Sequence, residues 1–132
     1  MKGKIYLSEF IAVKKTKRMG LGVLALANLP AGLLLETSPV IVMSAQERTL
    51  LDQTALHDYI FIWGEKEDQC AMALGYVSMY NHSFEPNCEY EMDYESGNMT
   101  VRTIKAVKKG EELFFSYNGD PNDKSPLWFE TT

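Results

Sequence analysis

The stretch Met79-Tyr-Asn-His-Ser-Phe-Glu-Pro-Asn-Cys88 concentrates polar and chain-breaking residues between an apolar run and an alternating, strand-like segment. Asn81 and His82 bring hydrogen-bond donors and acceptors to one place, and Pro86 prevents a regular helix from continuing through the stretch. Burial of such a polar segment costs free energy unless its groups are paired, and a bound ligand can supply the partners. An Asx or Ser turn, in which Asn81 or Ser83 caps backbone groups, explains the same residues equally well.

Length and composition indicate the class of protein. With 132 residues, we expect a single domain spanning residues 1–132. The chain is 45% hydrophobic and 23% charged, as is usual for a protein with a packed core. Its net charge of -5 disfavours nucleic acid as a direct partner and favours basic peptides, although mild acidity is also common for solubility alone.

The cysteines and the apolar runs bear on location. Cys70 and Cys88 are the only cysteines, so we expect reduced thiols and no disulfide framework. We see no signal-peptide core, and no apolar run approaches the roughly 20 residues of a membrane span. His57 and His82 do not complete a zinc-ligand spacing with these cysteines, and we predict no metal site. We expect a cytoplasmic protein without membrane contact, and action in a nucleus, including a host nucleus, stays open.

Short strands are predicted for most of the chain. Alternating or β-prone segments cover residues 4–13, 23–27, 33–37, 40–43, 59–63, 88–94, 98–107 and 113–117. Ser38-Pro39 should break the chain between two of them. One helix should begin at Ser44, where Ser44 and Glu47 form a capping box, and fade near His57-Asp58. The expected fold class is therefore mainly β, with few short helices.

Three separated motifs carry a family resemblance: Gly20-Leu-Gly-Val23, Asn81-His-Ser-Phe-Glu-Pro-Asn87 and Gly110-Glu-Glu-Leu-Phe-Phe-Ser-Tyr117. In this order and spacing the chain resembles a SET domain, the protein-lysine methyltransferase fold that uses S-adenosyl-L-methionine. The likeness runs from about residue 10 to residue 129, and the size is similar to that of minimal viral and bacterial members. The resemblance implies small sheets and a C-terminal pseudoknot that brings Asn81-His82 beside Tyr117.

The resemblance also implies where the cofactor binds. The backbone of Gly20, Leu21 and Gly22 would hold the methionine end of S-adenosyl-L-methionine. Asn81 would bond the amino or the carboxylate group of that end, and the His82 backbone would contact the adenine edge. Leu21 stands where relatives often have a polar or aromatic residue, which is a departure from the family pattern.

The residues assigned to chemistry follow from the same resemblance. Tyr117 matches the catalytic tyrosine, either as a group that positions the amine or as a general base. Tyr59 matches an aromatic residue that lines the substrate-lysine channel. Phe115, two residues before Tyr117, stands at the position that tunes how many methyl groups are added. A Tyr there would hold a water in the space of further methyl groups, so Phe115 predicts di- or trimethylation.

The zinc-binding features of larger relatives are missing. Phe84 stands where zinc-dependent members have a cysteine, and no cysteine follows Cys88. The tail Pro126-Leu-Trp-Phe129 would then close the site, with Trp128 covering the adenine or forming a wall of the lysine channel. A plain hydrophobic anchor explains Trp128 as well.

Two other interpretations stay open from the sequence. A catalytically weak SET-like module could bind lysine-containing peptides without transfer, although Asn81 and Tyr117 are both intact. A homodimer is compatible with so short a chain. The neighbouring Glu111 and Glu112 point to opposite sides of a strand and are predicted to form a solvated strand entrance and no carboxylate pair.

Overall fold

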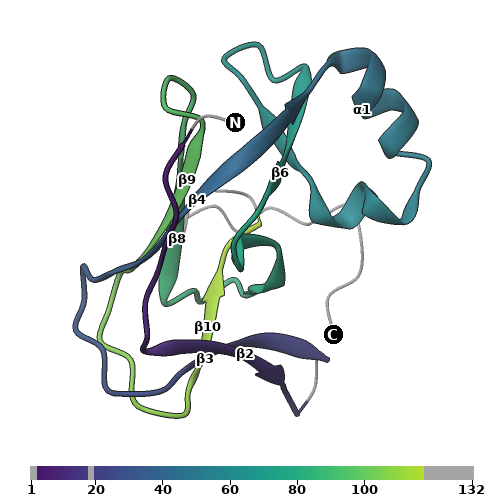
Figure 1. The fold of residues 1–132 in the computed structure, drawn as a ribbon. Helices are drawn as coiled ribbons and strands as arrows, with labels where there is room; N and C mark the ends of the chain where they lie inside the picture. The colour runs from purple at the N-terminus through teal and green to yellow at the C-terminus, as the bar shows by residue number, and fades with distance from the viewer. Residues whose placement is uncertain (1–2, 18–19, 118–132) are drawn as a thin grey trace.

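Strands dominate the computed structural model, which describes residues 3–17 and 20–117 (Figure 1). The strands are β1 (Tyr6–Leu7), β2 (Ile11–Lys15), β3 (Leu21–Ala25), β4 (Leu34–Met43), β5 (Phe61–Trp63), β6 (Gln69–Ala73), β7 (Asn81–His82), β8 (Cys88–Asp93), β9 (Asn98–Thr103) and β10 (Glu112–Phe115). The helical elements are α1 (Ala45–Leu51) and two 3-10 helices, η1 (Ala55–Tyr59) and η2 (Val77–Met79). The mainly β prediction is confirmed. Within the described ranges, no helix has the length and apolar character to cross a membrane.

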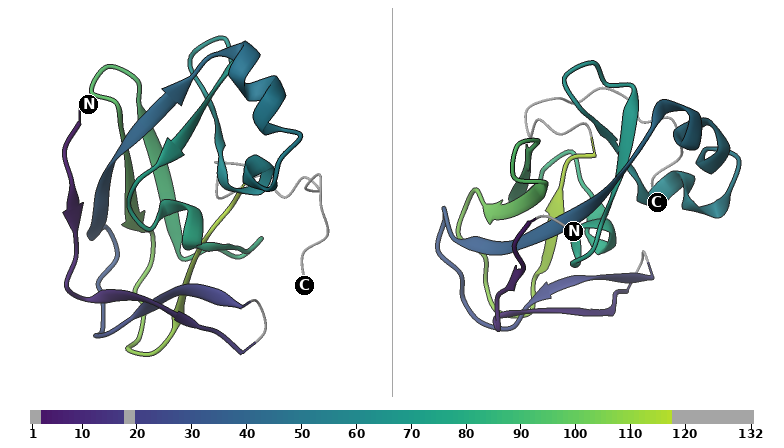
Figure 2. Two further views of the ribbon diagram at one scale, coloured as in Figure 1. Left: turned by 45° about the vertical axis from the view of Figure 1, so that its right-hand side comes forward. Right: turned by 45° about the horizontal axis from the view of Figure 1, so that its top comes forward.

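The strands form two sheets. The larger has the order β5-β6-β4-β9-β8, with β1 added beside β4, and the smaller has the order β2-β3-β10-β7. In the views of Figures 1 and 2, the β2–β3 hairpin lies at one end of the molecule and α1 lies at the other, beyond the end of β4. Strand β10 connects the two regions, because it pairs with β3 and β7 and also packs against β8.

Strand β4 continues through Pro39 without the predicted break. The strand changes partners there: Pro39 stands opposite Asn98 of β9, and Val40 stands opposite Ala73 of β6. A proline cannot donate to a ladder, and at this junction one ladder ends where the other begins. The prediction was wrong because the proline terminates one pairing without terminating the strand.

Helix α1 begins as expected and ends early. The capping box is confirmed, with Ser44 Oγ accepting from the Glu47 N–H at 3.1 Å and Glu47 accepting from the Ser44 N–H at 3.0 Å. The helix ends at Leu51, well before the expected residues 57–58. Thr54 then caps a separate 3-10 helix through its hydroxyl oxygen.

That 3-10 helix, η1, contains Tyr59, which the sequence placed in a strand. Tyr59 is the last residue of η1, and β5 begins only at Phe61. The strand prediction was wrong at this position because local capping by Thr54 overrides the β preference of the aromatic run. Tyr59 is consequently 49% exposed, while Trp63 at the other end of the run is buried.

The core lies between the sheets and reaches the segment just before the central motif. Its fully buried members include large side chains from both sheets: Val23, Leu35, Met99, Val101, Leu113 and Phe115. Cys70 and Cys88 are free and buried, as expected. Tyr80 is also fully buried, and the polar stretch Asn81-His82 follows it directly in the chain.

Candidate active site

A parallel pair of short strands brings the first and last parts of the site together. In the β7–β10 pair, Asn81 stands opposite Phe114 and His82 stands opposite Phe115. The Asn87 amide extends this pairing, because its Nδ2 donates to the Glu112 carbonyl at 2.9 Å and its Oδ1 accepts from the Phe114 N–H at 2.8 Å. The predicted placement of the Asn81-His82 motif beside the segment ending in Tyr117 is confirmed.

The hydroxyl and the backbone N–H of Tyr117 both make hydrogen bonds. Its hydroxyl donates to the carbonyl oxygen of Tyr80 at 2.7 Å, and its backbone N–H donates to Nδ1 of His82 at 3.0 Å. Because the hydroxyl proton goes to a carbonyl, the hydroxyl oxygen can only accept from a further group. Burial, with smaller effects of Tyr59, Glu112 and Asp58, raises the pKa of Tyr117 to about 12.

This raised pKa bears on the two roles considered for Tyr117. A pH of 8 is about four units below this pKa, so removing the hydroxyl proton at pH 8 would cost about 5 kcal/mol. A general base should have a pKa near the working pH. The raised pKa therefore favours a hydroxyl that positions other groups and disfavours a general base.

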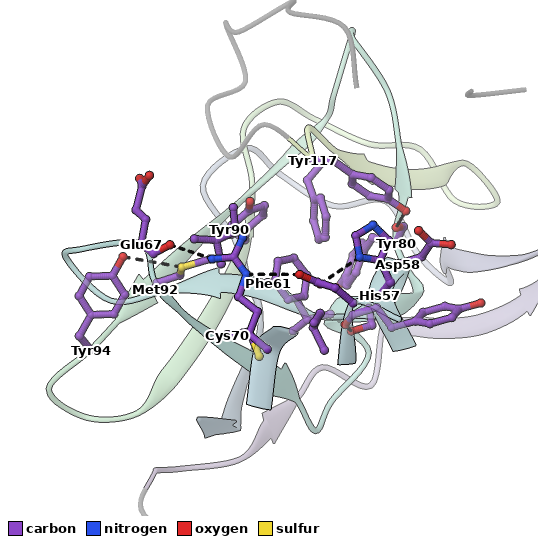
Figure 3. A pocket seen from close by; sticks show the side chains of 18 residues that line it. His57, Asp58, Phe61, Glu67, Cys70, Tyr80, Tyr90, Met92, Tyr94 and Tyr117 are labelled. Carbon is purple, nitrogen blue, oxygen red and sulfur yellow. Dashed lines mark hydrogen bonds and ion pairs between the residues drawn. The ribbon is translucent and has the colours of Figure 1, made fainter. Parts of the chain in front are cut away.

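A pocket of about 680 Å³ opens in front of Tyr117. Its lining includes all three residues assigned to the lysine channel, Tyr59, Phe115 and Tyr117. Figure 3 shows the aromatic rings gathered around it. Among residues 3–17 and 20–117, the Phe115 ring has four aromatic neighbours at centroid distances of 4.8 to 6.5 Å: Phe61, Tyr80, Tyr90 and Tyr117. An ammonium group that enters this aromatic pocket loses its hydrating water, which lowers its pKa.

Charged residues also line the pocket. Asp52 is contacted by Arg48 at 3.8 Å and by Nδ1 of His57 at 3.0 Å, and Arg48 donates to the carbonyl oxygen of Glu67 at 2.8 Å. In Figure 3, His57 and Asp58 lie at one end of the pocket and Glu67 lies at the other. With three carboxylates against one guanidinium among the lining residues, the pocket favours a cationic side chain.

A second corner of the site forms around Asn81. Its Nδ2 donates to the Leu21 carbonyl at 3.1 Å and to Oε2 of Glu112 at 2.8 Å. Two acceptors on one atom identify that atom as the amide nitrogen, so Oδ1 is left as the acceptor of the side chain. A Cβ on Gly22 would lie 2.6 Å from Oε2 of Glu112 and 2.8 Å from Nδ2 of Asn81. Any larger residue at position 22 would displace these side chains, and the φ of 73° at Gly20 favours glycine there as well.

Glu112 is the residue of this corner that the sequence reasoning missed. It is half-buried and bonded to Asn81, so the prediction of a solvated strand entrance was wrong for Glu112. Burial raises the pKa of Glu112, and the bond from Asn81 opposes the rise. The neighbouring Glu111 is exposed, as predicted, and accepts from the Lys108 N–H. The alternation along β10 does predict that one glutamate faces inward.

His82 presents a buried donor. Since Nδ1 accepts from the Tyr117 N–H, the neutral ring carries its proton on Nε2. Burial lowers the pKa of His82, which favours this neutral form. Within residues 3–17 and 20–117, Nε2 is buried without a hydrogen-bond partner. Trp128 and the rest of the predicted closing tail lie outside the described residues.

The comparison with known families settles what this site belongs to. The family model described as "SET domain" matches residues 20–118. The chain is a SET-domain protein. The matched range contains the Gly20–Gly22 backbone, the β7 motif and Tyr117.

Relatives of known function agree with this assignment. The SET domain is 36% identical to a histone-lysine N-methyltransferase of Schizosaccharomyces pombe, named as specific for H3 lysine-37, over 91% of this chain and 77% of that protein. It is 36% identical to the histone-lysine N-methyltransferase SETD7 of Halocynthia roretzi over 39% of this chain and 16% of that protein. The chain is therefore an enzyme of the protein-lysine methyltransferase class, and this favours the enzyme over the binding module.

Solved structures share its fold. A candidate histone methyltransferase of Plasmodium falciparum superposes with a TM-score of 0.64 at 28% identity, over 84% of this chain and 95% of that chain. A humanized mutant of the Chaetomium thermophilum Polycomb Repressive Complex 2 superposes with a TM-score of 0.69 at 21% identity, over 85% of this chain and 15% of that chain. The second likeness concerns the fold alone.

Proposed function

We propose that this SET domain transfers methyl groups from S-adenosyl-L-methionine to a lysine ε-amine in a basic, histone-like tail, and that it forms di- or trimethyl-lysine. The observation that carries the proposal is the Tyr117 hydroxyl, which is bonded to the Tyr80 carbonyl at the wall of an aromatic pocket. The same β7–β10 pair connects this pocket to the Asn81 corner. The two corners suit a cofactor and an acceptor lysine on either side of Tyr117.

The Asn81 corner fits the methionine end of the cofactor chemically. Gly22 is buried, and its missing side chain lets Asn81 and Glu112 pack directly against its backbone. Asn81 offers an acceptor oxygen, because Leu21 and Glu112 occupy both protons of its amide nitrogen. Of the two contacts considered for Asn81, this favours the amino group of the cofactor over its carboxylate. The buried His82 Nε2–H adds a donor for an acceptor of the ligand.

The chain's residues then do three things in the reaction. When bound, S-adenosyl-L-methionine supplies an electrophilic methyl group on a sulfonium. The aromatic wall desolvates the lysine, whose free pKa of ~10.4 makes deprotonation at neutral pH cost roughly 4.6 kcal/mol. Tyr117 directs the amine through its acceptor oxygen, and alignment of this kind is worth about 7–11 kcal/mol in favourable systems.

The substrate class follows from charge and from the relatives. The pocket carries three carboxylates, Asp52, Asp58 and Glu67, against Arg48, and the chain has a net charge of -5. A tail rich in lysine or arginine complements both. The relatives named above act on histones by name. Action on a nuclear substrate follows for this chain if its acceptor is a histone.

Methyl transfer from labelled cofactor tests the proposal. We expect the purified chain to label core histones or a mixture of basic proteins, and calorimetry to give a one-to-one complex with the cofactor. Mass spectra of the product should contain di- or trimethyl-lysine at long times. A protein that binds cofactor but labels no basic protein would contradict the substrate class. A protein that binds no cofactor would contradict the whole proposal.

Two further assignments belong to the same proposal. We assign Trp128 to the closure of the cofactor or lysine site, and truncation at Ser125 should weaken cofactor binding. Unchanged binding after truncation would leave Trp128 as an ordinary anchor. A homodimer stays a prediction, and light scattering of the purified chain tests it.

A further inference from the structure

Glu36 is a fully buried carboxyl group at the centre of the larger sheet. It lies on β4 with 0% of its surface exposed, and its sheet neighbours are apolar, Leu7 of β1 and Val101 of β9. Neither ion pair found among the described residues involves it. A buried charge without a countercharge is unfavourable unless hydrogen bonds replace its lost water.

Four donors surround this carboxylate. Ser38 Oγ donates to Oε1 at 3.0 Å, and the Tyr80 hydroxyl donates to Oε2 at 3.2 Å. The backbone N–H groups of Tyr76 and Val77 also face the carboxylate, where they act to lower its pKa. A Cβ on Gly75 would lie 3.0 Å from Oε1 of Glu36, and closer still to Ser38. The backbone at Gly75 therefore packs directly against Ser38 and the carboxylate. Glu36 holds in place the residues at which η2 begins, Tyr76 and Val77.

The same turn supports the lysine channel. The Tyr80 ring, held by Glu36 at its hydroxyl, stacks on Phe115 at 5.1 Å with an interplanar angle of 27°. The Tyr80 carbonyl accepts the Tyr117 hydroxyl at 2.7 Å. From within η2, Ser78 Oγ donates to the Tyr59 carbonyl at 2.8 Å. Each residue assigned to the channel thus has a contact with the segment that Glu36 anchors.

We propose that Glu36 is a positioning residue of the methyl transfer, which orients the Tyr117 hydroxyl through Tyr80 without touching the pocket. This inference rests on the proposed function. It assigns Tyr80 a role beyond packing, because a Phe at that position would keep the ring stack and lose the anchor. It also assigns the orientation of Tyr117 to the ionised carboxylate, which alone can accept from four donors.

Protonation of Glu36 should disturb this arrangement near neutral pH. A protonated carboxyl must donate one hydrogen bond, so at least one of its four donors loses its acceptor. Burial raises the pKa of Glu36 to about 7 against the lowering effect of those bonds. The titratable groups that face the Glu36–Tyr80 pair are Tyr76 and Cys88. Burial raises the pKa of Cys88 to about 12 and that of Tyr80 well above its ordinary value.

The test is the pH profile of kcat between pH 5.5 and 9, at saturating cofactor and peptide, with the cofactor Kd measured alongside. Wild type should lose activity below about pH 7. Tyr80→Phe breaks the link through which Glu36 acts on Tyr117, so its kcat at pH 8 should fall about tenfold and its acid limb, the fall of kcat toward low pH, should be weaker than in wild type. Glu36→Gln should lower kcat similarly and lose this limb. Both variants should keep the KM for peptide and the cofactor Kd within twofold of wild type.

Thr103→Ala is the matched control. Thr103 is buried and bonded to Pro30 and Leu33 away from the channel, so this variant should lose stability while its kcat and pH profile stay unchanged. Folded Tyr80→Phe with a wild-type profile and a kcat within twofold would overturn the inference, even if Glu36→Gln does not fold. A fall in kcat of Thr103→Ala equal to that of Tyr80→Phe would overturn it too. Absence of transfer in wild type would instead overturn the proposed function.

Discussion

Tyr117 is the residue at which the cofactor and lysine corners meet, and its assigned role can be isolated. Tyr117→Phe removes the bond to the Tyr80 carbonyl and the acceptor oxygen, while the ring stays among Phe115 and His82. We expect kcat to fall at least about a hundredfold, within the range that single positioning and acid–base groups contribute. The cofactor Kd should stay within twofold, which isothermal calorimetry measures. Near wild-type turnover would make Tyr117 a packing residue.

Glu112 should act on cofactor binding through Asn81. Without the carboxylate, the Asn81 amide loses one of the two acceptors that fix its orientation and keeps only the longer bond to the Leu21 carbonyl. We expect Glu112→Ala to raise the cofactor Kd about tenfold, as loss of a residue that orients a ligating side chain does at metal sites. Glu111→Ala is the matched control, because Glu111 is exposed and its side chain accepts a bond from the nearby Lys108 N–H. Equal affinities of the two variants would contradict the role of Glu112.

Phe115 should control product multiplicity by the space around its ring. The ring is buried against Tyr80 and Tyr90 at 5.1 and 4.8 Å and lines the pocket. Phe115→Tyr adds a hydroxyl that can hold a water where further methyl groups need room. Product mass spectra should then shift toward monomethyl-lysine. If wild type stops at monomethyl-lysine at long times, Phe115 does not set the product.

At the scale of elements, the short β7–β10 pair depends on one side chain. The side-chain amide of Asn87 bonds both the N–H of Phe114 and the carbonyl of Glu112, as the backbone of a neighbouring strand would. Asn87→Ala leaves a part-buried N–H without its acceptor, and we expect a loss of about 2 kcal/mol in the free energy of unfolding. Urea unfolding measures it, with Asn28→Ala as control because Asn28 makes one exposed backbone bond. Equal losses would mean that Asn87 does not secure the pair.

The elements also separate what the sequence predicted from what it could not. The capping box at Ser44 and the strands that begin at Cys88 and Asn98 depend on neighbours in the chain, and all were predictable, although the second strand ends at Thr103 and not at residue 107. The continuation of β4 through Pro39 depends on a change of strand partner, which only the assembled sheet contains. Tyr59 was misplaced because one threonine hydroxyl decides between a 3-10 turn and a strand.

The site shows the same division. The motifs around Gly22, Asn81 and Tyr117 are recognisable from residue types in order. The contact of Asn81 with Glu112 joins residues 31 positions apart, and that of Tyr80 with Glu36 joins residues 44 positions apart. Charged residues are usually exposed, so no pattern in the sequence indicates a buried Glu36. Its role follows only from the four donors that the fold assembles around it.

At the scale of the whole molecule, Glu36 should make stability depend on pH. Its pKa of about 7 in the folded chain is above its ordinary value of 4.5. Between these values the folded state binds more protons than the unfolded state, so the free energy of unfolding falls as pH rises. The contribution is fully present below about pH 4.5 and is lost as pH rises through 7. The difference corresponds to roughly 3 kcal/mol.

Chemical unfolding of wild type and Glu36→Gln at intervals from pH 4.5 to 8 measures this contribution. His82, whose pKa burial lowers, contributes in the opposite sense, because its buried neutral form loses stability as pH falls below its unfolded pKa. Subtracting the two curves removes this term, since both proteins contain His82. We expect Glu36→Gln to gain stability relative to wild type with rising pH, while Thr103→Ala stays parallel to wild type. If the Glu36→Gln curve also runs parallel, Glu36 does not bind a proton on folding, and the acid limb of kcat must have another source.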